Sequence, residues 1–322
     1  MKKHEYWDKY EELSYDDGSR RAHRRRKGEG PRSAATRAER RAKRVAELTD
    51  FDDSVIGFVP SYVANMDPAH HERNWVVKSL TPFYQNNQIV DVMRLVKGGK
   101  EANVYWCEAQ PETGMRWLAA KLYRPRMLRH LKNDAMYKEG RMTLDGDGQE
   151  ARKSRDLRAL QKKTRYGQHL DFMTWIVHEF RTQALLYEAG GAVPRPLAHG
   201  GNVILMEYIG DEYGPAPTLS EVRLPEEEGQ LLFDKIVENV RLMLAHHYVH
   251  GDLSPYNILY WESDVVIIDF PQLVDARVNQ HALGFLTRDL RRVYDYFAPL
   301  GVMCEPEALA AQMWKDYEEA RL

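Results

Sequence analysis

The sequence contains few cysteines and no long apolar run. Its two cysteines, Cys107 and Cys304, are far apart and form neither a metal-ligand pattern nor a disulfide framework. No apolar stretch approaches the roughly 18 residues that span a membrane, and residues 1–12 are charged and aromatic rather than typical of a signal peptide. These absences argue against secreted and membrane-spanning proteins, so we expect a soluble cytoplasmic protein with no membrane partner.

The charges are strongly separated along the chain, although the formal net charge is only −2. Residues 20–44 carry 12 Lys and Arg against two Glu, which leaves an acidic remainder. Because almost no apolar residue occurs there before Val45, we expect residues 1–50 to form a disordered basic arm. Lys and Arg release counterions from phosphate, so nucleic acid or a ribosomal particle is a candidate partner of residues 20–44. The arm lacks aromatic residues for base stacking, so a solubilising tail without a specific partner stays open.

The strongest chemical motif lies between His250 and Phe270. It places Asp252 and Asn257 in one loop and Asp269 directly after an apolar run. Phosphoryl transfer from ATP needs a carboxylate at the acceptor, together with an amide and a second carboxylate that hold Mg²⁺ against the phosphates. A polar surface turn would use the same residue types, but it would not need a second aspartate at the end of a strand. The motif therefore predicts an ATP site.

A lysine and a glutamate are predicted to form a buried ion pair. Lys121 is the one cation within the apolar strand predicted over residues 117–123, and a buried lysine needs a counter-charge or a phosphate. The helix predicted over residues 171–187 places Glu179 on its apolar face by i, i+3, i+4 spacing. An edge-strand lysine that points to water is the alternative. The pair is favoured because it matches the kinase arrangement that orients the α- and β-phosphates.

Other segments predict parts of a nucleotide site and its scaffold. A Gly-Gly turn in residues 97–103, between strands predicted over 89–96 and 104–107, would let backbone N–H groups approach phosphate. This turn is neither a Walker A loop nor the three-glycine loop of ordinary protein kinases. A buried strand over residues 203–210 runs into a linker that could carry adenine-binding backbone groups. Residues 133–168 form a long polar insertion, which we expect to be mobile and to contain a frayed helix.

Three segments resemble the RIO family of atypical serine/threonine protein kinases. They are Gly-Lys-Glu-Ala-Asn-Val-Tyr at residues 99–105, Met-Glu-Tyr-Ile-Gly at 206–210 followed by Pro-Ala-Pro-Thr-Leu at 215–219, and Ile-Ile-Asp-Phe-Pro-Gln at 267–272. The resemblance covers roughly residues 90–302. Small-molecule phosphotransferases with a His-Gly-Asp loop do not share these segments. The chain departs from well-known members in its basic arm and its longer insertion, and it lacks a recognisable winged helix.

The resemblance implies an α+β, two-lobed protein-kinase-like fold that lacks the usual activation segment. No Ala-Pro-Glu motif follows Asp269 before the helix predicted over residues 283–297. Two further helices are predicted over residues 226–248 and 306–320. The expected organisation is the basic arm over 1–50, a helical N-terminal extension over 51–88, a small β-rich N-lobe over 89–208 with its mobile insertion over 133–168, and a mainly helical C-lobe over 209–322.

The resemblance also implies cofactors and residue roles. Members of this family bind ATP with Mg²⁺ or Mn²⁺, autophosphorylate on serine, and turn ATP over slowly in small-subunit ribosome maturation. By this resemblance Asp252 is the catalytic aspartate, Asn257 and Asp269 hold the metal, and Lys121 and Glu179 orient the phosphates. Some members are thought to phosphorylate the metal-binding aspartate, which would make Asp269 catalytic as well. The remaining nucleotide contacts are the phosphate-loop residues Lys100, Glu101, Ala102, Asn103 and Val104 and the hinge residues Met206, Glu207 and Ile209.

Three functions stay open at this point. The first is a serine/threonine kinase that acts on itself or on a protein acceptor of unknown identity. The second is an ATPase switch that binds ribosomal RNA or a ribosomal particle and has little kinase activity. The third is a small-molecule phosphotransferase of the aminoglycoside-kinase type, which the phosphate loop and hinge argue against.

Overall fold

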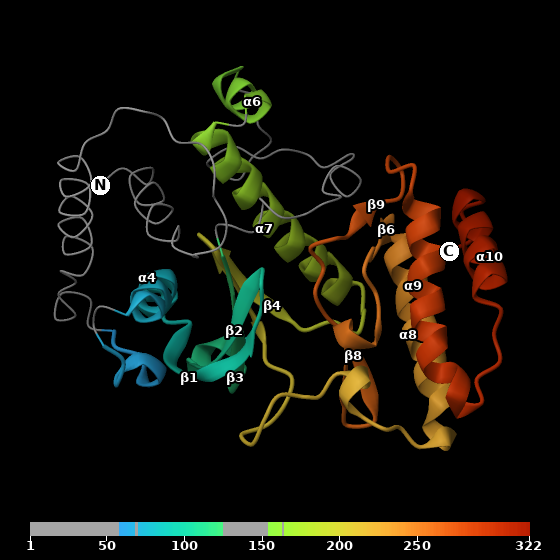
Figure 1. Cartoon of the computed structure of the whole chain (residues 1–322), viewed down its shortest axis with the longest axis horizontal. Coiled ribbons are helices and arrows are strands. Elements are labelled where there is room, and N and C mark those ends of the chain that lie inside the picture. The colour runs from blue at the N-terminus through green and yellow to red at the C-terminus, as the bar shows by residue number, and fades with distance from the viewer. Residues whose placement is uncertain (1–57, 68–69, 125–153, 163) are drawn as a thin grey trace, which may run out of the picture.

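The chain forms two lobes, which the computed structural model describes over residues 58–67, 70–124, 154–162 and 164–322 (Figure 1). The predicted basic arm and most of the predicted insertion lie outside these residues. An antiparallel sheet forms the N-lobe, and the C-lobe is mainly helical. Within the described residues, no helix is both long enough and apolar enough to cross a bilayer.

A five-stranded antiparallel sheet is the scaffold of the N-lobe. Its spatial order is β1, β2, β3, β5, β4. The strands are β1 (Ile89–Gly98), β2 (Ala102–Ala109), β3 (Trp117–Tyr123), β4 (Pro196–Gly200) and β5 (Val203–Glu207), and a 3-10 turn, η2 (Pro111–Thr113), joins β2 to β3. Because β3 is central, Lys121 lies between Val104 of β2 and Ile204 of β5.

The two faces of the sheet have different roles, because successive strand residues point to opposite sides. Leu118, Ala120 and Leu122 of β3 pack into an apolar cluster with α4 (His71–Gln85). The 3-10 turn η1 (Ser61–Val63) contributes its buried Val63 to the same cluster. Helix α4 therefore covers one face, and Lys121 points to the other. Both elements lie in the described part of the range predicted as a helical extension, residues 51–88.

Helix α7 (Arg165–Glu188) connects the two lobes (Figure 1). Phe172, Trp175 and Ile176 pack against Tyr123 and Ile204 of the sheet. Further along the helix, Leu186 belongs to the apolar core of the C-lobe. The helix ends at the predicted glycines, since Gly190 has a positive φ of 85° just after the C-cap.

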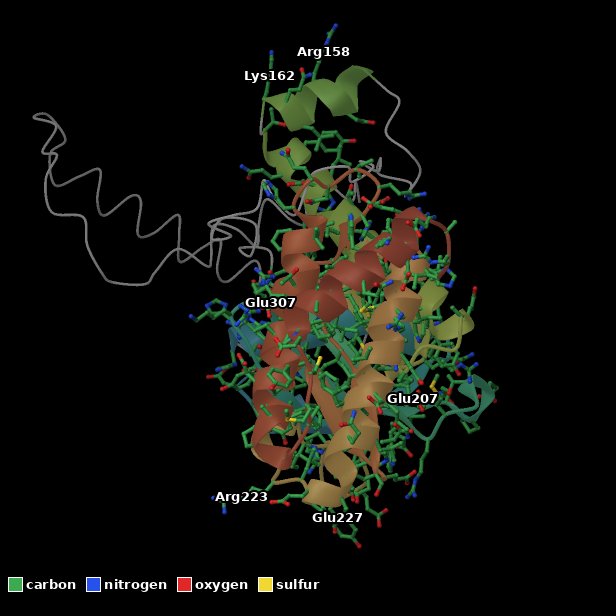
Figure 2. All side chains as sticks on the ribbon, turned by 90° about the vertical axis from the view of Figure 1, so that its right-hand side faces the viewer. Arg158, Lys162, Glu207, Arg223, Glu227 and Glu307 are labelled. Atoms are coloured by element: carbon green, nitrogen blue, oxygen red, sulfur yellow. The ribbon has the colours of Figure 1, made fainter. Side chains whose placement is uncertain are left out.

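A short helix, α6 (Ser154–Gln161), packs against the first turns of α7. Thr164 caps α7 by accepting a 3.1 Å hydrogen bond from the N–H of Gly167. A Cβ at Gly167 would collide with the carbonyl of Ala159, so glycine permits the close approach of the two helices. Figure 2 shows Arg158 and Lys162 pointing away from the body at this end of the molecule.

The C-lobe surrounds one apolar core. Three helices lie beside one another at its outer side: α8 (Glu226–Ala245), α9 (Ala282–Phe297) and α10 (Pro306–Glu318) (Figure 1). Two small antiparallel sheets pair β6 (Tyr248–Val249) with β9 (Val274–Asp275) and β7 (Ile258–Trp261) with β8 (Asp264–Ile267). The lobe also contains the 3-10 turns η4 (Leu219–Glu221), η5 (Pro255–Asn257) and η6 (Ala298–Leu300).

Two predicted helix boundaries are wrong by three residues or more. Helix α7 begins at Arg165 rather than at residue 171, because the Thr164 cap and the packing of α6 extend it. Helix α8 ends at Ala245 rather than at residue 248. There His247 adopts a positive φ of 69°, and the following two residues pair with β9 instead of continuing the helix. The described end of the predicted insertion is therefore helical.

Candidate active site

Lys121 joins the two lobes through two ion pairs. Its Nζ lies 2.8 Å from Oε1 of Glu179 on α7 and 2.5 Å from Oδ1 of Asp269, which follows β8. The side chain of Glu179 is 2% exposed and that of Lys121 is 13% exposed, whereas that of Asp269 is 40% exposed. The predicted contact between Lys121 and Glu179 is confirmed. Asp269, the most exposed of the three side chains, forms a charged group with Lys121 and Glu179.

In this charged group, the carboxylates of Glu179 and Asp269 share the single ammonium of Lys121. Burial acts to lower the pKa of Lys121, but the charges of Asp269 and Glu179 outweigh it and keep this pKa well above the usual range. Burial raises the pKa of Glu179, and Lys121 only partly offsets the effect. For Asp269, Lys121 outweighs burial, so the pKa is lowered and the carboxylate stays ionised. A cation that arrived here would meet an ionised, partly exposed oxygen ligand.

The backbone places Asp269 in an uncommon conformation. Its φ is 72°, in the left-handed region that non-glycine residues rarely adopt. On one side, Nε2 of His250 lies 3.2 Å from the carbonyl of Ile268, the residue before it. On the other side, the indole N–H of Trp175 donates to the carbonyl of Pro271 at 3.1 Å. Strained residues of this kind persist where the surrounding structure holds them, and they concentrate at functional sites.

Asn257 forms hydrogen bonds both to the loop of Asp252 and to the segment just before Asp269. Its side-chain N–H donates to the backbone carbonyl of Asp252 at 2.9 Å. Its own backbone carbonyl accepts from the N–H of Ile268 at 3.0 Å. These two hydrogen bonds of Asn257 therefore connect the loop of Asp252 to Ile268, the residue before Asp269. The side-chain oxygen of Asn257 is its remaining polar atom that could bind a metal.

Two residues that the sequence reasoning did not assign to the site contact the carboxylate of Asp252. Arg292 on α9 lies 2.9 Å from its Oδ1, and the amide of Gln272 lies 3.5 Å from its Oδ2. Gln272 stands in one of the RIO-like segments, so a sequence signal for it existed. Arg292 comes from a helix forty residues downstream of Asp252, and no local pattern pointed to it.

Helix α9 also holds the backbone of the loop. The N–H of Gly251 donates to Oδ2 of Asp289 at 2.8 Å, and the guanidinium of Arg288 donates to the carbonyl of Gly251. Asp289 is 1% exposed, and burial raises the pKa of its carboxyl group to about 7. Gly251 has a positive φ of 78°, which glycine adopts without strain. One face of α9 therefore fixes both the peptide and the side chain at the start of the loop.

The predicted phosphate loop lies at the turn between β1 and β2. The N–H of Gly99 donates to the carbonyl of Ala102 at 2.9 Å, and Lys100 at the tip is exposed. Burial raises the pKa of Glu101, and the negative charge of Asp269 raises it further. The side chain of Asn103 instead points into the fold.

The contacts of Asn103 differ from those expected of a phosphate ligand. Its amide donates to the hydroxyl of Tyr105 at 3.0 Å, and its oxygen accepts from Arg124 at 2.8 Å. The side chain is 3% exposed. These contacts leave the backbone of Asn103, rather than its side chain, as the group that could face a nucleotide.

An apolar face lies beside the predicted hinge. Val104 and Met206 pack with Ala119, Trp106 and Tyr208 on the face of the sheet that carries Lys121. The N–H of Glu207 donates to the carbonyl of Arg195 at 2.8 Å. The N–H of Arg195 donates to the side-chain carboxylate of Glu207 and not to the backbone carbonyl of Glu207. The carbonyl of Ile209 accepts from Ala216. The backbone carbonyl of Glu207 and the N–H of Ile209 are therefore the groups that could bind a flat, polar-edged ring.

The oxygen ligands offered by Asp269 and Asn257 fit a Mg²⁺ ion bound to phosphate better than a metal ion held by protein side chains alone. In the part of the chain that the structure describes, no three His, Cys, Asp or Glu side chains gather into a metal-binding group. Mg²⁺ usually takes one or two carboxylates and completes its shell with phosphate and water. Asp269, partly exposed and ionised, and the amide oxygen of Asn257 are the oxygen ligands that would serve this purpose.

Comparisons with known proteins give a consistent picture. The chain matches the RIO domain family over residues 103–309. It is 34% identical over 135 residues to the RIO-type serine/threonine-protein kinase Rio1 of Thermoplasma acidophilum, covering 42% of this chain and 69% of that protein. It is 31% identical over 216 residues to Rio1 of Haloferax volcanii, covering 66% of each. It is 27% identical over 278 residues to serine/threonine-protein kinase RIO1 of Caenorhabditis elegans, covering 84% of this chain and 47% of that protein.

A solved structure is also similar. The Rio2 kinase–ADP/Mg²⁺–phosphoaspartate complex from Chaetomium thermophilum aligns with a TM-score of 0.48 at 18% identity, covering 75% of this chain and 73% of that one. The two-lobed kinase-like fold predicted from the sequence is confirmed by the family match. The chain spans about half of the Caenorhabditis relative and about two thirds of the archaeal ones.

Proposed function

Because the chain belongs to the RIO domain family, we propose that it is an ATP-dependent serine/threonine protein kinase that autophosphorylates. The observation that carries this proposal is the placement of Lys121 between Glu179 and Asp269, at 2.8 Å and 2.5 Å. The named relatives are serine/threonine kinases, and this arrangement fits that chemistry. ATP and Mg²⁺, or Mn²⁺ in its place, are the proposed cofactors.

The proposed nucleotide lies between the two lobes. Its adenine would bind the carbonyl of Glu207 and the N–H of Ile209 beside Val104 and Met206. The phosphates would pass under the turn that holds Lys100, Glu101 and Ala102, with the backbone of Asn103 close by. These placements follow the groups that the fold leaves available at the hinge and at the β1–β2 turn.

Lys121 is proposed to bind the α- and β-phosphates while Glu179 holds it in position. When a phosphate-bound metal is present, it neutralises the charge that develops on the phosphoryl oxygens. Asp269 and Asn257 would hold that metal. Asp269 would exchange its contact with Lys121 for the metal, because its side chain is the most exposed of the three.

Asp252 is proposed as the group that receives the proton of the acceptor hydroxyl. The β–γ bridging P–O bond of ATP breaks, a P–O bond to the acceptor oxygen forms, and the hydroxyl proton passes to the Asp252 carboxylate. The loop fits this role because α9 fixes its backbone while the carboxylate stays 38% exposed. An acceptor can therefore reach it.

Incubation with radioactively labelled ATP and Mg²⁺ or Mn²⁺ tests the proposal. We expect transfer of the γ-phosphoryl group to the protein itself, with phosphoserine recovered after acid hydrolysis. A parallel analysis without acid would detect an acyl phosphate on Asp269. If ATP binds but no label reaches protein or water with either metal, the enzymatic assignment is wrong. The RIO match favours a protein acceptor over the aminoglycoside-type alternative.

A second candidate, an ATPase switch on ribosomal RNA or a ribosomal particle, is favoured by the charge of residues 20–44. Twelve Lys and Arg in that short stretch would contact phosphates. Deletion of residues 1–48 should leave ATP binding nearly intact and should reduce the slope of log K against log salt by about one for each lost contact. Filter binding of full-length and truncated protein measures the two slopes. Equal slopes would remove this partner for the arm.

A further inference from the structure

The guanidinium of Arg292 has no part in the function proposed so far, although it contacts the proposed catalytic carboxylate. Its Nη1 lies 2.9 Å from Oδ1 of Asp252, and the two side chains are 42% and 38% exposed. A partly exposed ion pair of this kind contributes little to stability. The contact therefore adds little to the stability of the fold, but it shows that the guanidinium of Arg292 reaches the carboxylate of Asp252.

The helix that carries Arg292 is firmly fixed beside the loop. One turn earlier, Arg288 and Asp289 hold the carbonyl and the N–H of Gly251, the residue before Asp252. On its other side, α9 buries Leu290 and Val293 in the core of the C-lobe. The backbone of Arg292 is thus anchored, while its long side chain ends in a partly solvated space next to the carboxylate. That combination suits a side chain that must move its tip without moving the helix.

The charges around Asp252 explain why a cation is needed there. Lys121, on the far side of the site, is already paired with both Glu179 and Asp269. Glu101 adds another carboxyl group. Burial is the main cause that raises its pKa, and the charge of Asp269 raises it further. A phosphoryl group that moved toward Asp252 would carry negative charge on three oxygens and would approach a second anion. Without a cation on this side, the reaction would be opposed by like charges.

We propose that Arg292 is a further catalytic residue that donates hydrogen bonds to the phosphoryl group during its transfer. This proposal rests on the kinase function proposed above and adds a charge-stabilising group to that same site. A proton acceptor lies about 3 Å from the hydroxyl that it activates, so a guanidinium bound to the same carboxylate is already close to the transferred group. A cis arginine that stabilises transferred phosphoryl oxygens is a known solution in nucleotide hydrolases.

The chemistry of Asp252 would release Arg292 at the right moment. When the acceptor hydroxyl gives its proton to Asp252, that carboxylate becomes neutral and holds the guanidinium less strongly. At the same time the charge on the phosphoryl oxygens increases as the bond to ADP breaks. Arg292 stays protonated throughout and only changes the oxygen atoms to which it donates. No other reactant is required.

Binding of ADP and Mg²⁺ with and without aluminium fluoride, which imitates the transferred phosphoryl group, tests the role. We expect Arg292→Ala to leave ADP affinity within about two-fold and to remove most of the extra affinity that aluminium fluoride gives the wild type. Its rate of phosphoryl transfer should fall by roughly 10²-fold or more. Arg292→Lys should recover only part of both, because lysine lacks the planar fork. Arg291→Ala is the matched control, since Arg291 sits on the same helix and pairs with Glu307.

The same measurement in an Asp252→Asn background separates catalysis from mere orientation of Asp252. A catalytic Arg292 predicts that Arg292→Ala still removes the aluminium fluoride effect when residue 252 is asparagine. Loss of that effect only when Asp252 is intact would overturn the proposal, as would wild-type behaviour of Arg292→Ala. If the wild type fails to bind ADP and Mg²⁺ at all, the kinase function itself is wrong. Equal melting temperatures of the Arg292 variants and the control would show that folding is unaffected.

Discussion

The two sides of the site are both built from ion pairs, but they differ in burial. On the Lys121 side, Glu179 is 2% exposed and Lys121 is 13% exposed. On the Asp252 side, Asp252 and Arg292 are both near 40% exposed. A buried pair is costly to break because it leaves an uncompensated charge in a medium of low polarity. An exposed pair can change partners at little cost.

This difference separates binding from chemistry. The Lys121 side joins a strand of the N-lobe to α7 and to the end of β8, and its proposed role is to fix where phosphates bind. The Asp252 side is held by α9 through its backbone, and its charged tips remain free to exchange protons and hydrogen bonds. Mutations on the two sides should therefore fail in different ways.

The largest effect is expected from Asp269→Asn. The metal would lose its charged oxygen ligand, and Lys121 would lose one of its two counter-charges. We expect Mg²⁺-dependent ATP turnover to fall below detection. Asp264→Asn, at the other end of β8 and paired with Lys235, is the control and should turn ATP over normally. Near-normal turnover by Asp269→Asn would show that the metal binds elsewhere.

Asp252→Asn should have the next largest effect, on rate alone. Asparagine keeps the shape of the side chain but cannot accept the acceptor proton, so transfer should slow by roughly 10²-fold or more. ATP affinity, measured by calorimetry with a non-hydrolysable analogue, should stay within a few-fold of wild type. If ATP affinity fell together with the rate of transfer, Asp252 would be a structural or metal-binding residue. The two sides of the site would then not differ in the way proposed.

The Lys121 side can be examined by a double-mutant cycle. Lys121→Ala leaves Glu179 buried without its cation and should lower the free energy of unfolding by about 3–5 kcal/mol. Glu179→Ala should cost less, because Lys121 keeps Asp269. The double variant should be little worse than Lys121→Ala alone. Additive losses in denaturant unfolding would show that the two residues do not interact in solution.

A pH-dependent change in stability is expected on the Asp252 side. Burial raises the pKa of Asp289 to about 7, whereas the unfolded chain should titrate near 4. Between these values the folded protein binds the proton more strongly, so rising pH lowers stability by about 1.4 kcal/mol per unit, and the effect levels off above pH 7. Asp289→Asn cannot ionise and should lack this slope. Chemical denaturation of both proteins from pH 4.5 to 8 measures it. Parallel curves would contradict a raised pKa.

Much of the fold followed from local pattern. The strand over residues 117–123 has the predicted bounds, and the apolar stripe of α7 correctly placed Glu179 on the buried face. The helix boundaries that failed depended on tertiary contacts: packing against α6 lengthened α7, and pairing with β9 shortened α8. Local propensity cannot anticipate such contacts, because their partners are distant in sequence.

By itself, the sequence determined the residue types that phosphoryl transfer needs and the spacing that places Asp252, Asn257 and Asp269 on one loop and the adjoining strand. It also favoured a buried counter-charge for Lys121, since a lone ammonium in an apolar strand is unstable. Only the tertiary structure decided that Lys121 binds Asp269 as well as Glu179, and that Arg292 reaches Asp252. Those contacts join segments separated by 148 and 40 residues. They are set by how helices and sheet pack, because no periodicity within one element records the position of another.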